Sequence, residues 1–222
     1  MKISACIFDL DGVLVDSAKY HFIAWSALAK KLGFEFTLDD NERLKGVSRM
    51  RSLDILLEIG KISMTEEEKI KAADEKNELY KSYVSKMTPQ EILPGTEDFL
   101  KDVKAHGLST AIGSASKNTQ LIIGCTGLDK YFDAVADGTI VSKAKPDPEV
   151  FLKAAAMLGV APSQCVVFED AQAGIQAAVN AGMIAVGVGD KNILYQADIV
   201  IPDFINMSFD SLASLLIKKI NN

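Results

Sequence analysis

The chain has few cysteines and no excess of positive charge. Its 222 residues include only Cys6, Cys125 and Cys165. This is an odd number without metal-like spacing, so we expect reduced thiols, two of them in the core. Twenty-four basic against 30 acidic residues give a net charge of −6. That balance argues against nucleic acid or an anionic membrane as the main partner, although a small phosphate ester could still bind.

Long apolar runs are also missing. No stretch approaches the length that crosses a bilayer, and no basic, apolar leader opens the sequence. These absences predict a soluble, cytoplasmic protein. No obvious stripe for dimer formation is present either, so we expect a monomer.

The spacing of apolar residues predicts an interrupted α/β fold. An apolar run over residues 3–8 is typical of a buried strand, but the next strand-like segment begins only at Leu108. A βαβ unit normally needs about 30 residues, so something is inserted. Between the two strands the patterns are helical, over residues 17–33, 38–44, 48–59 and 65–86. We expect an all-helical cap domain over 17–89 and a core domain formed by 1–16 and 90–222.

The remainder of the chain alternates between strand and helix patterns. Such alternation predicts a doubly wound parallel sheet. The expected strands cover 108–113, 134–136, 165–168, 184–188 and 199–201, and the expected helices cover 96–106, 118–126, 148–159, 171–181 and 209–220.

Two acids close the first strand. Strand alternation lets Asp9 and Asp11 both lean over its carboxyl end, and Gly12 permits a sharp turn. Ligands bind at that end in open α/β sheets. Paired carboxylates there repel one another unless a cation or a shared proton relieves them, which suggests a metal-assisted site. An Asp-rich turn remains the alternative, whereas a calcium loop fails because Val13 stands where an oxygen ligand belongs.

Later strand ends carry further polar residues. Strand 108–113 leads into Ser114, Ser116, Lys117 and Asn118 at a helix start, which suits a phosphate, although capping by Ser116 or Asn118 is the alternative. Lys145 lies in proline-stiffened backbone before another helix, where a solvated lysine is the alternative.

Two more acids follow strand 165–168. They are Glu169 and Asp170, with helix capping by Asp170 as the alternative. Gly187 and Gly189 hint at a dinucleotide loop, but Asn192 replaces the third glycine, so that reading is discarded.

Together these residues place acid, hydroxyl, lysine and acid at the ends of four strands. In this order, and with a helical insert after the first strand, the chain resembles the haloacid dehalogenase superfamily over its full length. The resemblance implies that Asp9 is the nucleophile and Asp11 the general acid and base. It implies that Ser114 and Lys145 neutralise the transferring phosphoryl group. It also implies one Mg²⁺ per chain, held by Asp9, the carbonyl of Asp11 and Asp170, with Glu169 in or near the ligand shell.

The cap narrows the resemblance to the β-phosphoglucomutase family within this superfamily. The residues that carry it are His21, Lys45, Gly46, Val47, Ser48, Arg49, Ser52 and Lys76, together with Ser114, Ala115, Ser116, Lys117 and Asn118. Ser17 stands where this family has threonine, which keeps the hydroxyl. The resemblance implies a mutase that interconverts β-glucose 1-phosphate and glucose 6-phosphate through β-glucose 1,6-bisphosphate. Arg49 would grip the distal phosphate and His21 would help to place Asp11.

Three other functions compete with this one. A phosphatase of the same superfamily, acting on a sugar phosphate or phosphoglycolate, would share the core residues but differ in the cap. A haloacid dehalogenase would not need Glu169 and Asp170. A catalytically inactive sugar-phosphate sensor would not need the complete set of core residues. In every case we expect a small-molecule partner.

Overall fold

The centre of the fold is a six-stranded parallel sheet. The structure, a computed structural model, describes residues 2–220, and the strand order is β3-β2-β1-β4-β5-β6. All five neighbouring pairs are parallel, and β1 lies between β2 and β4. The predicted parallel sheet is confirmed. The strands are β1 (Ala5–Phe8), β2 (Ser109–Gly113), β3 (Ala134–Ala136), β4 (Cys165–Glu169), β5 (Ile184–Val188) and β6 (Ile199–Ile201).

Helices cover both faces of this sheet, as the doubly wound pattern predicts. On one face α5 (Thr96–Ala105), α6 (Thr119–Thr126) and α9 (Phe209–Ile220) pack around a cluster that contains Phe8 and Phe168. On the other face α7 (Glu149–Leu158) and α8 (Gln172–Asn180) enclose a second cluster around Ile7 and Val167. Each face of β1 is therefore buried, which accounts for its continuous apolar run. Three short 3₁₀ helices lie at η1 (Pro89–Glu91), η2 (Asp129–Tyr131) and η3 (Pro162–Gln164).

The cysteines behave as the composition predicts. All three are free thiols, and Cys6 and Cys165 are fully buried in neighbouring strands. Burial raises the pKa of the Cys165 thiol to about 11, and that of Cys6 is raised further by burial and by Cys165. Both therefore stay protonated and serve as small apolar side chains.

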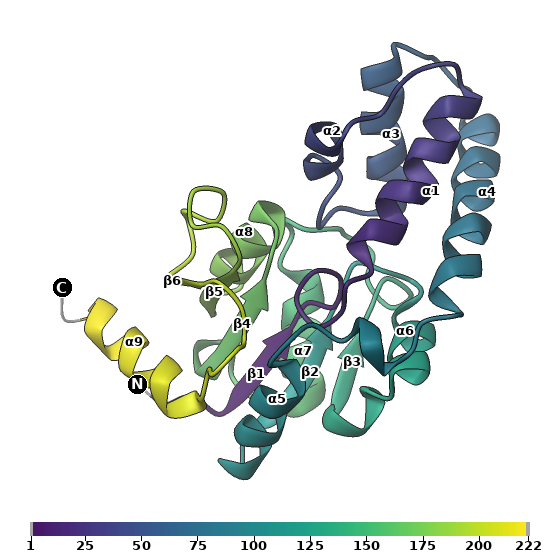
Figure 1. The fold of residues 1–222 in the computed structure, drawn as a ribbon. Helices are drawn as coiled ribbons and strands as arrows, with labels where there is room; N and C mark the ends of the chain where they lie inside the picture. The colour runs from purple at the N-terminus through teal and green to yellow at the C-terminus, as the bar shows by residue number, and fades with distance from the viewer. Residues whose placement is uncertain (1, 221–222) are drawn as a thin grey trace.

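Four helices that follow β1 form the insert. They are α1 (Ala18–Lys31), α2 (Leu38–Glu42), α3 (Arg49–Gly60) and α4 (Glu66–Val84). They pack around an apolar cluster of their own that includes Trp25, Leu28 and Leu53. Figure 1 shows this helical unit standing beyond the sheet, reached by the chain that leaves the carboxyl end of β1. The insert therefore lies over the carboxyl ends of the strands, where the predicted site residues are found.

Local capping fixes the ends of the longer cap helices. Thr65 and Glu68 form a capping box at the start of α4, with the Thr65 N–H donating to Glu68 Oε2 at 2.7 Å. Ser48 accepts the Arg51 N–H at 3.3 Å and so caps α3. Within residues 2–220, no helix is both long and apolar enough to span a membrane.

Candidate active site

Asp9 and the turn that follows it lie against the end of β4. The Asp9 N–H donates to the carbonyl of Phe168 at 2.9 Å, which continues the sheet ladder by one residue. Gly12 then adopts a φ of +86°, and a β-carbon at this position would lie 2.3 Å from Asp170 Oδ2. Only glycine allows both this backbone conformation and this close approach. The turn therefore brings Asp9 and Asp170 to one place.

A buried ion-pair network joins three of the predicted residues. Lys145 Nζ lies 2.6 Å from Asp9 Oδ1 and 2.5 Å from Glu169 Oε1, and all three side chains are buried. Burial lowers the pKa of Lys145, but the negative charges of Asp9 and Glu169 outweigh it and raise the pKa overall. Lys145 is thus a fixed cation, not the solvated lysine of the alternative interpretation.

Glu169 occupies the back of this network. Its Oε2 accepts the Ala171 N–H at 2.8 Å, while Oε1 accepts from Lys145. Burial raises its pKa to about 7, against the opposing charge of Lys145. In this arrangement Glu169 orients Lys145.

Asp170 lies close to two other acids, Glu169 and Asp9. Burial raises its pKa well above the usual range, and the charges of Glu169 and Asp9 add to the effect. Among residues 2–220 no three acidic, imidazole or thiol side chains form a ready-made metal cluster. Mg²⁺ is commonly bound by one or two carboxylates and completed by water and phosphate oxygens. The pair of Asp9 and Asp170 fits such a cation, which would relieve their repulsion.

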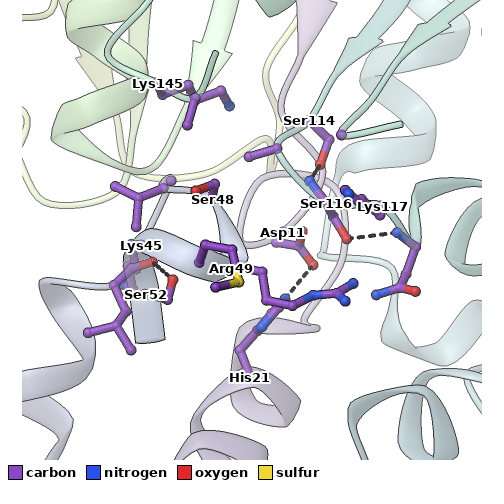
Figure 2. A pocket seen from close by; sticks show the side chains of 18 of the residues that line it. Asp11, His21, Lys45, Ser48, Arg49, Ser52, Ser114, Ser116, Lys117 and Lys145 are labelled. Carbon is purple, nitrogen blue, oxygen red and sulfur yellow. Dashed lines mark hydrogen bonds and ion pairs between the residues drawn. The ribbon is translucent and has the colours of Figure 1, made fainter. Parts of the chain in front are cut away.

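Asp11 points to the cap. Its Oδ1 accepts a hydrogen bond from the hydroxyl of Ser17 and another from Tyr80 at 3.3 Å, and His21 Nε2 lies 3.9 Å away. Figure 2 shows Asp11 and His21 facing one another. Burial, followed by the charge of Asp9, raises the pKa of Asp11 to about 6. A carboxyl with this pKa can hold or release a proton near neutral pH.

Lys76 is buried, although its helix is rich in charge. Its side chain lies over the rings of Trp25 and Tyr80, 4.4 and 4.8 Å from the ring centroids. Its Nζ is 2.9 Å from His21 Nδ1. Burial lowers the pKa of Lys76 to about 7, and the charge of Arg49 contributes. The pKa of His21 is lowered well below its usual value by burial and by the same cations, so His21 is neutral.

The remaining cap residues come from the turn before α3 and its first turns. Gly46 has a φ of +71°, and a β-carbon there would lie 3.0 Å from the β-carbon of Ala171, so this turn packs closely on the core. Arg49 Nη1 lies 3.6 Å from Asp74 Oδ1. Ser52 is buried and its hydroxyl donates to the Leu44 carbonyl at 3.5 Å. Lys45 is paired with Glu42 at 2.9 Å.

The loop after β2 is held by its own side chains. Ser114 Oγ accepts the Ser116 N–H, and Ser116 Oγ accepts the Asn118 N–H, both at 3.1 Å. Asn118 precedes α6 but its side chain makes no capping bond. Its Nδ2 donates instead to Asn77 Oδ1 in α4, at 3.0 Å. The structure therefore does not support the alternative interpretation in which the Asn118 side chain caps α6.

One cavity of about 460 Å³ collects nearly all of the predicted residues. Figure 2 shows Arg49 reaching across it, with Ser116 and Lys117 on one side and Lys45 on the other. The predicted residues that line it are Asp9, Asp11, His21, Lys45, Gly46, Val47, Ser48, Arg49, Ser52, Lys76, Ser114, Ala115, Ser116, Lys117, Asn118, Lys145 and Asp170. Glu169 is buried behind Lys145 and does not belong to the lining.

Sequence reasoning missed several residues of this cavity or next to it. Tyr80 and Ser17 bond to Asp11, and Asn77 bonds to Asn118. Further polar residues of the lining are Asn41, Asp74, Thr139, Ser142 and Lys143. Comparison with the family marks Ser17 as a serine in place of threonine, but it does not predict the contact of its hydroxyl with Asp11. No motif marks the others.

These features define the class of protein. The chain belongs to the haloacid dehalogenase-like hydrolase family, whose model matches residues 3–182. It is therefore an enzyme of a family whose members generally depend on magnesium.

Individual relatives give a more specific comparison than the family as a whole. The β-phosphoglucomutase of Bacillus subtilis is 41% identical over 210 residues, which cover 94% of this chain and 93% of the relative. A crystal structure of β-phosphoglucomutase from Clostridium difficile matches 99% of this chain and 100% of its own, with a TM-score of 0.94 and 42% identity. A phosphorylated carbohydrates phosphatase of Thermotoga maritima is 33% identical over 182 residues, which cover 81% of this chain and 82% of the relative. The resemblance to the β-phosphoglucomutases is confirmed, and phosphatases are also near relatives.

Proposed function

We propose that this enzyme interconverts β-glucose 1-phosphate and glucose 6-phosphate through β-glucose 1,6-bisphosphate. One observation carries the proposal: a single cavity has cationic and hydroxyl side chains suited to phosphate on two sides. Lys145 and Ser114 lie in the core beside Asp9, whereas Arg49 and Lys76 lie in the cap. A bisphosphate needs two such positions at once, and the identity to β-phosphoglucomutases supports this reading.

Asp9 is the residue that accepts the phosphoryl group in this proposal. Its carboxylate oxygen forms a bond to phosphorus as the bond from phosphorus to the sugar oxygen breaks, which gives an aspartyl phosphate. Lys145 already contacts Asp9 and would meet the charge on the phosphoryl oxygens, together with Ser114. Positioning and electrostatic stabilisation supply most of the catalysis in such transfers.

Asp11 moves the proton. As general acid it protonates the departing sugar oxygen, and as general base it takes the proton of the hydroxyl that attacks the aspartyl phosphate. A pKa of about 6 suits both roles. Ser17 and Tyr80 both bond to Asp11 and hold its carboxyl in place.

Asp9, Asp170 and the carbonyl of Asp11 would hold Mg²⁺, with Glu169 nearby. When bound, the ion neutralises phosphoryl charge and the repulsion between the carboxylates. Glu169 accepts a hydrogen bond from Lys145 and keeps this lysine aligned.

The mutase and the phosphatase are separated by one incubation. The enzyme is supplied with β-glucose 1-phosphate, Mg²⁺ and a trace of β-glucose 1,6-bisphosphate, and glucose 6-phosphate is measured against free phosphate. We expect glucose 6-phosphate to form in large excess. Stoichiometric release of free phosphate, with no glucose 6-phosphate, would contradict the proposal.

Arg49 offers a sharper test of the second phosphate position. Arg49→Ala should slow the mutase reaction by roughly ten- to a hundredfold, because a charge-assisted bidentate contact contributes about 1.5–3 kcal/mol. Hydrolysis of acetyl phosphate, which has no distal phosphate, should barely change. Arg51→Ala is the matched control, since Arg51 lies in the same turn of α3 but pairs with Glu58 at the surface. Equal loss of both activities in Arg49→Ala would place Arg49 in the transfer site instead.

A sugar-phosphate phosphatase is the second candidate. It is favoured by the Thermotoga maritima phosphatase and by the fructose-1-phosphate phosphatase YqaB of Escherichia coli, which is 34% identical over 190 residues. Such a phosphatase would share the core residues and differ in the cap, so the distinction depends on the cap residues and on the incubation above.

A further inference from the structure

Helix α4 reaches from the cap to the core loop that follows β2. Asn77 Oδ1 accepts a hydrogen bond from Asn118 Nδ2 at 3.0 Å, in partly buried surroundings. The two residues are far apart in sequence, and both line the cavity. Neither the motif of the core nor that of the cap includes Asn77.

The hydrogen bond to Asn77 leaves one side-chain N–H of Asn118 free to bind a ligand. An amide nitrogen carries two protons, so donation of one to Asn77 leaves the second available. The backbone of Asn118 is already fixed by Ser116, whose Oγ accepts its N–H. The hydrogen bond to Asn77 Oδ1 fixes the rotation of the Asn118 side-chain amide. It thereby fixes the direction of the free N–H of this amide.

Asn77 is itself held firmly. It follows Lys76, whose side chain is buried between His21, Trp25 and Tyr80. Asp74, one helical turn earlier in α4, contacts Arg49. Residues three apart lie on the same helix face, so this face of α4 contacts a cap residue and a core residue of the same expected phosphate site.

We propose that Asn77 is a positioning residue for the distal phosphate of a sugar bisphosphate, acting through Asn118. The inference rests on the proposed function and adds a residue to it. Asn77 orients the amide of Asn118 without touching the phosphate, and it joins the cap to the core at the place where Arg49 and Asn118 share the ligand.

Binding without turnover gives the direct test. In an Asp9→Asn background, which lacks the nucleophile, calorimetry measures the dissociation constant of β-glucose 1,6-bisphosphate. Asn77→Ala should weaken binding by about two- to tenfold, the range for one neutral hydrogen bond. In steady-state assays of the enzyme with Asp9 intact, the same substitution should raise KM for the sugar phosphate, change kcat little and leave acetyl phosphate hydrolysis unchanged.

A double-mutant cycle separates positioning from a structural role. If Asn77 acts through Asn118, Asn77→Ala should have no further effect in an Asn118→Ala protein. An unchanged dissociation constant in the single variant, or an equal loss in both backgrounds, would overturn the proposal.

Two controls complete the experiment. Glu75→Ala breaks a surface contact of α4 with Lys31 inside the cap, 2.6 Å long, and should leave bisphosphate binding unchanged. Thermal unfolding of each variant checks that the fold is intact. Because binding is measured without turnover, a wild-type enzyme that only releases phosphate would refute the mutase and still leave the Asn77 result readable.

Discussion

Two buried lysines show how the core and cap sides of the cavity differ. Lys145, in the core, contacts two carboxylates within 2.6 Å, and their charges raise its pKa. Lys76, in the cap, contacts a neutral imidazole and two aromatic rings, and burial lowers its pKa to about 7. Within the described residues, no carboxylate forms an ion pair with Lys76. The core cation is neutralised by the protein itself, whereas the cap cation lacks a counter-ion.

This difference assigns different tasks to the two sides. A charge that is already paired keeps its place without substrate, which suits the residues that surround the reacting atom. An unpaired buried cation gains most when an anion arrives. The core side is therefore preorganised for transfer, and the cap side responds to the phosphate that it selects. Variants of the two sides should differ accordingly.

The largest effect is expected on the core side, at Asp9. Asp9→Ala should abolish phosphoryl transfer, by about a thousandfold or more, because no other group can carry the phosphoryl. Formation of glucose 6-phosphate and hydrolysis of acetyl phosphate should both disappear, which no cap variant should cause. Asp98→Ala, at an exposed acid of α5, serves as the control. Substantial acetyl phosphate turnover in Asp9→Ala would remove Asp9 from the central role.

The second-largest effect is expected at Lys145, the lysine that is paired with two carboxylates. Lys145→Met should lower the free energy of unfolding by about 3–5 kcal/mol, because Asp9 and Glu169 stay buried without their cation. Urea unfolding without added metal measures this change. Lys153→Met removes a surface lysine that pairs with Glu149 and should cost less than about 1 kcal/mol. Equal stability of the two variants would show that the buried network is not needed for folding.

Substitution of Lys76, the lysine without an ion pair, should change the free energy of unfolding in the opposite direction. Lys76→Met should raise the free energy of unfolding at pH 6 by about 2 kcal/mol, because a depressed pKa means that the buried charge opposes folding. The wild-type protein should itself become more stable as the pH rises from about 7 towards 10.5, since only its unfolded state then keeps the proton on Lys76. The increase in the free energy of unfolding that Lys76→Met causes should shrink over the same pH interval.

Urea unfolding at several pH values checks this pattern. Lys81→Met is the control, as Lys81 pairs with Glu78 on the exposed face of the same helix. A gain that does not depend on pH would show that folding does not lower the pKa of Lys76. Lys76→Met should also weaken sugar phosphate binding, because the cap loses the cation that lacks a counter-ion.

The sequence predicted the core side of the site more completely than the cap side. Asp9, Ser114, Lys145 and Asp170 follow strands, and parallel strands bring their carboxyl ends together whatever the side chains are. The sheet, the helical insert and the order of elements followed from the same periodicities. The boundaries of the two domains at 16/17 and 89/90 stay a prediction.

The contacts of α4 could not be predicted in this way. Its charged residues recur all along the helix, a pattern typical of a solvated helix face, yet Lys76 is buried. Which residues of α4 face the core depends on how the cap docks on the loop after β2. That docking brings Asn77 to Asn118 and Tyr80 to Asp11, and no local pattern encodes it. The resemblance to the family found Lys76 but not these neighbours.

The smallest effect is expected from Asp74, and its sign is the opposite of the other site variants. Asp74 lines the cavity and lies 3.6 Å from Arg49, with 69% of its side chain exposed. In the absence of ligand it partly neutralises the guanidinium that we expect to bind the distal phosphate. Asp74→Asn should therefore strengthen binding, but only slightly, because water and salt screen an exposed pair.

We expect KM for the sugar phosphate to fall by about two- to threefold at low ionic strength and the gain to vanish near 0.5 M salt, where screening is strong. Acetyl phosphate hydrolysis should not change, since the core side is untouched. Glu66→Gln removes another exposed acid of α4, which pairs with Lys69 away from the cavity, and it should leave KM unchanged. A rise in KM on Asp74→Asn would mean that Asp74 holds Arg49 in its productive position. The cap side would then be preorganised like the core, and the contrast between the two lysines would not extend to Arg49.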